Sequence, residues 1–355
     1  MTWAKTITLI VAIALVAGGA VWAYRLYGAP EPVEAVTPKW EGSGHADWAS
    51  ESFVHWNEDD PAEIPVGCAK CHSTNGYHDY LGADGSTPGA VDHPAPIGGV
   101  LYCTTCHNSV SQELTSVVFP DGTELDGFWW EGNCMRCHQG RQSTASVNGA
   151  IAGLDADTVA EGLGFLNVHY AVGAATRMGH EAAVGYEYPG KAYVGRYPHT
   201  EDFDSCIECH DPHSTAIDPD TCAPCHGNVV DYGDLFEIRL SRDDYDGDGD
   251  VVEGILGEIN TLHEALLAAI QSYAAEVIGA PIAYTDNFPY WGAAEGGRYA
   301  TWTPRLVRTT YIYHYVVEDP GAFTHNAPYV LQMLYDALED LSAVVPVDMA
   351  AYTRP

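Results

Sequence analysis

Basic residues are scarce in this chain of 355 residues, in which 15 lysines and arginines stand against 49 aspartates and glutamates. The formal charge of −34 excludes a nucleic-acid-binding surface and a polybasic membrane patch, because both need clustered positive charge. The same charge favours partner proteins that carry basic docking patches.

Cysteine is absent outside one repeated motif. All ten cysteines lie in five Cys-x-x-Cys-His pentapeptides, namely Cys68/Cys71/His72, Cys103/Cys106/His107, Cys134/Cys137/His138, Cys206/Cys209/His210 and Cys222/Cys225/His226. Two thiols at this spacing add across the two vinyl groups of one porphyrin, while the adjacent histidine ligates the iron. Disulfide frameworks do not place a histidine after every pair, and zinc sites accommodate one there poorly. The motifs therefore predict five covalent haem c groups, with the five motif histidines as proximal ligands.

An export segment precedes the motifs. Residues 6–24 form one apolar run behind Lys5, so haem attachment is expected outside the cytoplasmic membrane, at a periplasmic or extracellular location. Val21-Trp22-Ala23 resembles a cleavage site, but the run is also long enough to span a bilayer, and we favour a retained anchor. Residues 1–27 are thus interpreted as a signal or N-terminal membrane anchor, and the proline-rich residues 28–44 as a linker.

Residues 45–230 have little helical or strand periodicity and are rich in Gly, Pro, Asp and Ser. This composition predicts a loop-rich pentahaem region with short helices, whose apolar core is supplied by stacked haems. The first cysteines of successive motifs are separated by 35, 31, 72 and 16 residues. The fourth and fifth haems must therefore be close neighbours.

Residues 231–355 have a different character. Apolar residues from Ile255 to Val277 recur at helical spacing, and the pattern ends at Gly279. A second helix is expected from about Pro328 to Leu341, with Asn326 as its N-cap. The aromatic residues between them, 284–315, are expected to cover a haem or the seam between the two regions. We interpret the region as two amphipathic helices that pack on the haem region.

Methionine is too rare to supply many sixth ligands, because only Met178, Met333 and Met349 lie outside the motifs and the apolar segment. Eleven histidines lie outside the motifs, which favours bis-histidine ligation. The distal candidates are His45, His55, His169, His199 and His325, with His213 in reserve. His263 fits a helical core position better. The sequence context of His78, His93, His180 and His314 does not favour them.

An acidic loop follows the last motif. Asp244, Asp246, Asp248 and Asp250 alternate as in the opening of an EF-hand calcium loop, in which carboxylates converge on a hard cation. The closing position holds Ile255 in place of glutamate, so Glu253 would close the site from a shifted position. These five acidic residues are candidate Ca²⁺ ligands, and a solvated acidic turn is the alternative.

The chain resembles the secreted multihaem c-type cytochromes of anaerobic and metal-respiring microbes. The likeness lies in GHADW and FVHW before CAKCHST, in CHQGRQST and CIECHDPH, in DYDGDGD, and in DPGAFTHNAPYVLQMLYDALEDL. The resemblance implies low-potential, mostly bis-histidine haems stacked into a wire. It also makes His45, His55, His169, His199 and His325 more attractive as ligands.

The leading hypothesis is an exported electron-transfer protein that relays electrons between a quinol-linked donor and a periplasmic or extracellular acceptor, without bond chemistry of its own. One version has subunits that form a homo-oligomer or filament and donate a distal ligand across the interface. The alternative is a multihaem reductase of nitrite, hydroxylamine or a sulfur oxyanion with one open haem site. No motif here replaces its histidine by lysine, the change that marks some such enzymes. A third reading is a calcium-stabilised structural or docking component.

Overall fold

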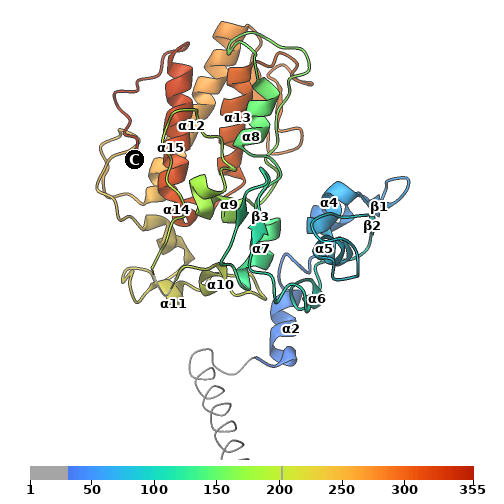
Figure 1. Ribbon diagram of the computed structural model, residues 1–355. Helices are drawn as coiled ribbons and strands as arrows, with labels where there is room; N and C mark the ends of the chain where they lie inside the picture. Colours follow the sequence, from blue (N-terminus) through green and yellow to red (C-terminus); the bar gives the residue numbers. More distant parts are fainter. Residues whose placement is uncertain (1–30, 201–202) are drawn as a thin grey trace, which may run out of the picture.

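Short helices joined by loops make up most of the described chain, which comprises residues 31–200 and 203–355 of a computed structural model (Figure 1). Within these ranges, strands occur in three antiparallel pairs, β1–β2, β3–β4 and β5–β6. In chain order the elements are α2 (Val33–Glu41), α3 (Glu51–Val54), β1 (Glu63–Ile64), α4 (Val66–His72), α5 (Thr74–Leu81), β2 (Ala95–Pro96), α6 (Cys103–Cys106), β3 (Val117–Val118), β4 (Glu124–Leu125), α7 (Glu131–Cys137), α8 (Thr144–Ile151), α9 (Gly173–Met178), η1 (Gly179–Glu181), α10 (Cys206–Cys209), α11 (Pro219–Cys222), η2 (Tyr232–Glu237), α12 (Ile255–Tyr273), η3 (Ala274–Ile278), β5 (Ile282–Tyr284), β6 (Trp291–Ala293), α13 (Pro304–Val317), α14 (Ala322–His325) and α15 (Ala327–Ser342). The loop-rich architecture with short helices agrees with the sequence prediction.

The larger hydrophobic core lies around three long C-terminal helices, α12, α13 and α15 (Figure 1). Helix α12 buries Ile259, Leu262, Leu266 and Ile270, which lie on one face at steps of three and four. The same core takes in buried side chains from residues 117–194, which lie among the haem motifs in sequence. Ordinary side chains therefore supply much of the apolar core, so haems are not its only source.

Helix α15 begins where the sequence predicts a cap. The side chain of Asn326 accepts a hydrogen bond from the backbone N–H of Tyr329 at 3.2 Å. At the end of α12, the π-helical turn η3 stops at Gly279, whose φ of +75° suits glycine.

Helix α13 lies in the segment that was expected to be an aromatic covering. The hairpin β5–β6 precedes it, and Thr303 caps it by accepting from the N–H of Leu306 at 3.2 Å. Its polar residues Arg305, Thr309 and His314 are as buried as its apolar ones. A helix that is buried on all sides has no apolar stripe, so its periodicity is hidden in the sequence.

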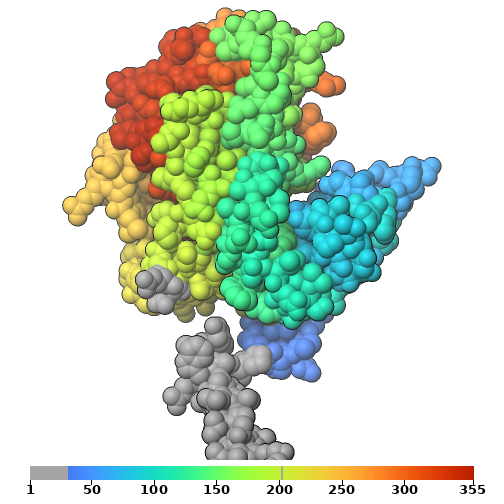
Figure 2. All heavy atoms as spheres, in the orientation of Figure 1, coloured from blue at the N-terminus to red at the C-terminus, as the bar shows by residue number. Residues whose placement is uncertain are grey.

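A smaller core of Trp56, Ile64, Ala69 and Ala95 belongs to the N-terminal part of the haem region. In Figure 2 this part, coloured blue to cyan, projects to one side of the larger body. Helices α4 and α5 pack closely there and carry the first motif.

Residues 33–41 form helix α2, where the sequence predicts a linker without helical periodicity. Pro32 precedes its first turn, and Pro38 removes one internal hydrogen bond from a helix with no buried residue. Lys39 pairs with Asp211 at 2.9 Å, and the Trp40 indole N–H donates to the Leu101 carbonyl at 2.9 Å. The segment is thus attached to the haem region and is not a free spacer.

The predicted N-terminal apolar segment lies outside the described residues. Across residues 31–200 and 203–355, none of the helices combines the length and the apolar character needed to cross a bilayer.

Candidate haem sites and an acidic loop

The five motifs lie on short helical turns, at α4, α6, α7, α10 and α11. In four of them the histidine N–H donates to the carbonyl of the first cysteine at 2.9 Å, which closes one α-helical turn; the four histidines are His107, His138, His210 and His226. This turn brings the two cysteines of a motif, three residues apart, to the same side of the helix. All ten cysteines are free of disulfides. Each motif therefore offers two thiols and an imidazole from one compact turn.

The fifth motif is the least helical of the five. Helix α11 ends at Cys222, so Cys225 and His226 follow it in a turn, in which the N–H of Cys225 donates to the Cys222 carbonyl at 3.2 Å. Cys225 is exposed. An exposed thiol is accessible to a porphyrin, so Cys225 keeps its place as a candidate attachment residue.

The same exposure extends to part of the second and fourth motifs. Three further cysteines are exposed, namely Cys103, Cys106 and Cys209, while the remaining six are half-buried. The second and fifth motifs thus lie nearer the surface of the polypeptide than the first and third.

Every motif histidine faces one histidine from elsewhere in the chain. The ring-centroid separations are 5.9 Å for His72–His169, 6.1 Å for His107–His213, 6.2 Å for His138–His45, 6.4 Å for His210–His325 and 6.1 Å for His226–His199. An iron atom held about 2 Å from one nitrogen of each ring would separate the centroids by roughly 6 Å. Five paired imidazoles beside five thiol pairs fit five haem c groups.

Burial keeps several of these imidazoles neutral, the form that ligates a metal. It lowers the pKa of His138 to about 4, and the neighbouring His45 adds to this effect. Burial likewise lowers the pKa of His169 to about 4. The pKa values of His45 and His199 are lowered by burial too.

Hydrogen bonds at the second ring nitrogen orient three of the paired histidines. Nδ1–H of His72 donates to the Ser52 carbonyl at 2.8 Å, and Nδ1–H of His210 donates to the Thr215 carbonyl at 3.2 Å. Nδ1 of His325 lies 2.8 Å from a carboxylate oxygen of Asp319. Each bond leaves Nε2 without its proton and available to a metal.

The structure reverses the order of preference between His55, a first-choice distal candidate from the sequence, and His213, the reserve candidate. Nδ1 of the exposed His55 lies 2.7 Å from Glu51, and its ring packs edge-on against Trp56. His55 is therefore not among the paired rings, whereas the reserve candidate His213 is stacked against His107. His45, His169, His199 and His325 all lie in pairs, as their candidacy requires.

The remaining five histidines have other partners or lie at the surface. Nε2–H of His263 donates to the Tyr313 carbonyl at 2.9 Å, and the two rings stack, which agrees with the predicted core position. His314 is fully buried among aromatic rings and lies 3.1 Å from Glu318. His78 bonds the Thr104 carbonyl, His180 bonds Glu187, and His93 is exposed.

The third motif is adjacent to three of the other four motifs. Neighbouring thiols from different motifs are Cys71–Cys137, Cys106–Cys134, Cys134–Cys206 and Cys209–Cys222. The third motif therefore adjoins the first, second and fourth, and the fourth adjoins the fifth. The close approach of the last two motifs is what their short connection predicts.

The acidic loop brings carboxylates together in two overlapping groups. Asp244, Asp246 and Glu258 form one group and Asp246, Asp248 and Glu253 the other, with the potential ligand atoms of each group within 4.8 Å of one another. Burial and the neighbouring carboxylates raise the pKa of Glu253 to about 7, and burial raises the pKa of Asp246. A buried oxygen of Asp246 and one of Glu253 lack hydrogen-bond partners.

Glu258 is the residue of this loop that sequence reasoning missed. It lies in the first turn of α12, fully buried, and one carboxylate oxygen accepts from the backbone N–H of Tyr245 and of Asp246, each at 2.8 Å. A glutamate three positions past the standard EF-hand closing position was its only sequence signal. Asp250, which the sequence includes, lies outside both groups and bonds the N–H of Val252 and Glu253.

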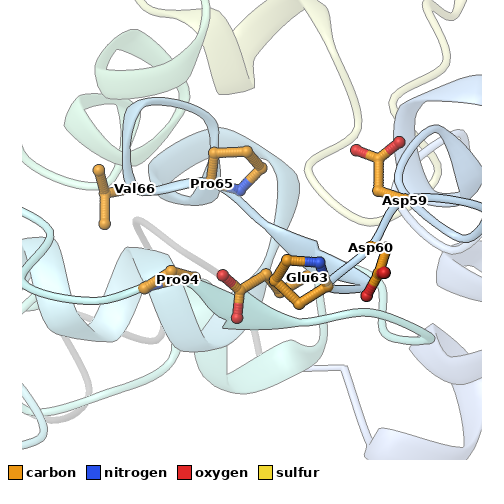
Figure 3. Close-up of a pocket in the computed structure, with 7 residues that line it drawn as sticks. Asp59, Asp60, Glu63, Pro65, Val66 and Pro94 are labelled. Atoms are coloured by element: carbon orange, nitrogen blue, oxygen red, sulfur yellow. The ribbon is translucent and has the colours of Figure 1, made fainter.

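A shallow acidic pocket lies apart from these sites, beside the start of α4 (Figure 3). It is lined by Asp59, Asp60, Pro61, Glu63, Pro65, Val66 and Pro94. None of the paired histidines lines it, so it does not belong to the candidate haem sites.

No protein-family model matches the chain. The chain is 24% identical, over 374 residues, to the C-type polyheme cytochrome OmcB of Geobacter sulfurreducens in each of two strains. This alignment covers 82% of the chain and 46% of OmcB. The chain is therefore similar, over most of its length, to a multihaem c-type cytochrome. Among solved structures, the Outer Cell Wall Cytochrome OcwA matches this chain with a TM-score of 0.45 and 16% identity, over 86% of this chain and 50% of that one.

The chain spans about half the length of the relatives that it matches. This similarity confirms the resemblance seen in the motifs.

Proposed function

We propose that this cytochrome is an exported electron-transfer protein that holds five haem c groups, each between two histidines of its own chain. Haem c, when bound, supplies reversible one-electron chemistry at its iron. The protein's residues supply covalent attachment, axial ligands and burial, which set the potentials and the spacing of the groups.

The observation that carries the proposal is the complete pairing of the motif histidines. Each of the five faces a second histidine at 5.9–6.4 Å between ring centroids. With both axial positions filled, an iron transfers electrons without binding a substrate. The distal ligands in this proposal are His45, His169, His199, His213 and His325.

A multihaem reductase would need one iron with an open or weakly ligated site. The pairing leaves no motif histidine without an opposing imidazole, so it favours the relay over reduction of nitrite, hydroxylamine or a sulfur oxyanion. The adjacency of the motifs supports the same reading. The third motif links the first and second to the fourth and fifth, so the groups would form one connected path.

The charge of the chain suggests which partners would exchange electrons with it. With a formal charge of −34, the surface would attract basic docking patches and accelerate encounter at low ionic strength. We propose a quinol-linked donor and a periplasmic or extracellular acceptor. Export follows from the predicted N-terminal segment, which would also tether the protein to the membrane if it is not cleaved.

An oligomer or filament remains compatible with this function but is not needed to complete the sites. All five opposing histidines come from the same chain as the motifs that they face. A distal ligand donated across a subunit interface is therefore unnecessary.

The acidic loop would hold Ca²⁺ in this proposal. Asp244, Asp246, Asp248, Glu253 and Glu258 are the ligands that its geometry favours, since these carboxylates converge and two buried oxygens lack partners. The C-terminal tail covers the loop, because the N–H of Thr353 donates to the Tyr245 carbonyl at 3.0 Å. Cation binding would neutralise repulsion among these groups and fasten α12 to the tail.

Low-temperature EPR and magnetic circular dichroism of the purified ferric protein test the main proposal. Five low-spin haems, together with a mass increase of five haems, would support it. A persistent high-spin haem that binds nitrite or cyanide would instead establish an open site and the reductase.

A further inference from the structure

His325 differs from the other paired histidines in the group that its second nitrogen meets. Nδ1 lies 2.8 Å from one carboxylate oxygen of Asp319 and 3.0 Å from the other. Asp319 is 3% exposed, so solvent does not weaken this contact. Across the described residues, none of the other nine paired imidazole rings hydrogen-bonds a carboxylate, whereas the rings of His72 and His210 bond backbone carbonyls.

Asp319 is itself held in place. The N–H of Gly321 donates to its carboxylate at 3.2 Å, and the hydroxyl of Thr176, from α9, also bonds it. The Thr176 hydroxyl also hydrogen-bonds the hydroxyl of the fully buried Tyr315, at 3.1 Å between the two oxygens. The carboxylate therefore has little freedom to turn away from His325.

Two glycines lie close to the ring of His325. A Cβ added to Gly173 would lie 2.7 Å from the ring Cε1, and one added to Gly321 would lie 2.6 Å from the same atom. Any side chain at either position would displace the ring. The backbone at these two glycines and the carboxylate of Asp319 thus restrict how this imidazole can turn.

A carboxylate that accepts the Nδ1 proton of a ligating histidine makes the imidazole a stronger electron donor. Stronger donation favours ferric over ferrous iron and lowers the reduction potential, as a nearby negative charge does. A backbone carbonyl accepts the same proton without a full charge and has a weaker effect.

We propose that Asp319 is a positioning residue that gives the haem between His210 and His325 the lowest potential of the five. The inference rests on the proposed function, because it requires His325 to be an axial ligand. The haem of the fourth motif would then have a lower reduction potential than the haems of the third and fifth motifs on either side of it.

The test uses the full-length holoprotein with Asp319→Asn, which keeps the shape and removes the charge. In a spectroelectrochemical titration, the lowest of five midpoint potentials should become more positive, and its EPR g values should shift while the haem stays low-spin. Glu318→Gln is the matched control, because Glu318 faces His314, which lies outside the pairs. An unchanged titration in Asp319→Asn, with five haems present, would overturn the inference.

Two further variants separate the possible failures. If His325→Ala leaves five low-spin haems, His325 is not a ligand and both the ligand assignment and this inference fail. If His325→Ala produces a high-spin haem but Asp319→Asn leaves the midpoint potentials unchanged, the ligand assignment stands and only the role of Asp319 is refuted. If Asp319→Asn does not incorporate five haems, Thr176→Val is the variant to measure. Loss of the Thr176 hydroxyl should loosen the Asp319 carboxylate and make the lowest midpoint potential more positive. An unchanged potential in Thr176→Val would refute the role of Asp319.

Discussion

The rings of His107 and His213 lie parallel, with 9° between their planes and 6.1 Å between their centroids. His213 follows the fourth motif by only three residues, yet it faces the histidine of the second motif, more than 100 residues earlier. Two haem sites are therefore connected by one short stretch of backbone, since His210 and His213 would ligate different irons.

Replacing His213 by alanine should open one axial position. We expect one of five haems to become high-spin in the EPR spectrum and to bind cyanide, because no second imidazole faces His107. His55→Ala is the matched control, since that exposed ring bonds Glu51 and should leave five low-spin haems. The reverse pattern, with His55→Ala alone producing a high-spin haem, would contradict the pairing.

The exchange of His55 and His213 shows what the sequence could not supply. The CxxCH spacing defines proximal ligands because attachment is local, whereas a distal ligand depends on the path of a loop. Four of the five preferred candidates lie opposite motif histidines. His55 and His213 could be distinguished only when the fold brought the second and fourth motifs together. The exposure of Cys225 has the same origin, since the motif fixes the thiol spacing but not what covers it.

The helices show a similar limit. The periodicity from Ile255 onward predicts α12, and the Asn326 cap predicts α15, because each has one buried stripe or a local capping residue. Helix α13 has no stripe, since His314 and Arg305 are buried on faces that would otherwise be polar. Glu258 escaped notice because its ligand geometry depends on the first turn of α12 folding back on the loop.

Removal of Ca²⁺ should destabilise the C-terminal region. At a cation concentration 100 times the dissociation constant, binding to the native state alone adds about 2.7 kcal/mol to the free energy of unfolding. We expect EGTA to lower the Tm of the wild-type protein, and Asp246→Asn to abolish that dependence. Asp250→Asn is the control, because Asp250 lies outside both carboxylate groups. Equal calcium responses in Asp246→Asn and wild type would refute the site.

The ion pair between Asp157 and Arg305 predicts a pH-dependent contribution to stability. Nε and Nη2 of Arg305 donate to the two carboxylate oxygens at 2.7 and 2.9 Å. This contact lowers the pKa of Asp157 from its ordinary value of 3.8. A lowered pKa means that folding favours the carboxylate, so the contribution is complete above the ordinary pKa and is lost as the pH falls through the lowered one.

Asp157→Asn should therefore reduce the free energy of unfolding by about 1 kcal/mol at neutral pH, since the pair is partly exposed. The difference from wild type should shrink as the pH is lowered below the ordinary pKa of 3.8. Thermal melts at several pH values measure it, with the exposed Glu264→Gln as control. A loss of equal size at every pH would show that the charge of Asp157 is not responsible.

The glycines beside His325 predict that one methyl group can disrupt a haem site. In Gly173→Ala the new Cβ would meet the ring Cε1 at 2.7 Å, well inside van der Waals contact, so the imidazole must move. We expect a weakened axial bond, seen as high-spin character at one haem and a raised potential. Gly149→Ala, in α8, has no heavy atom within 4 Å of its new Cβ and should leave all five haems low-spin. Five unperturbed low-spin haems in Gly173→Ala would mean that the ring position is not what holds this site together.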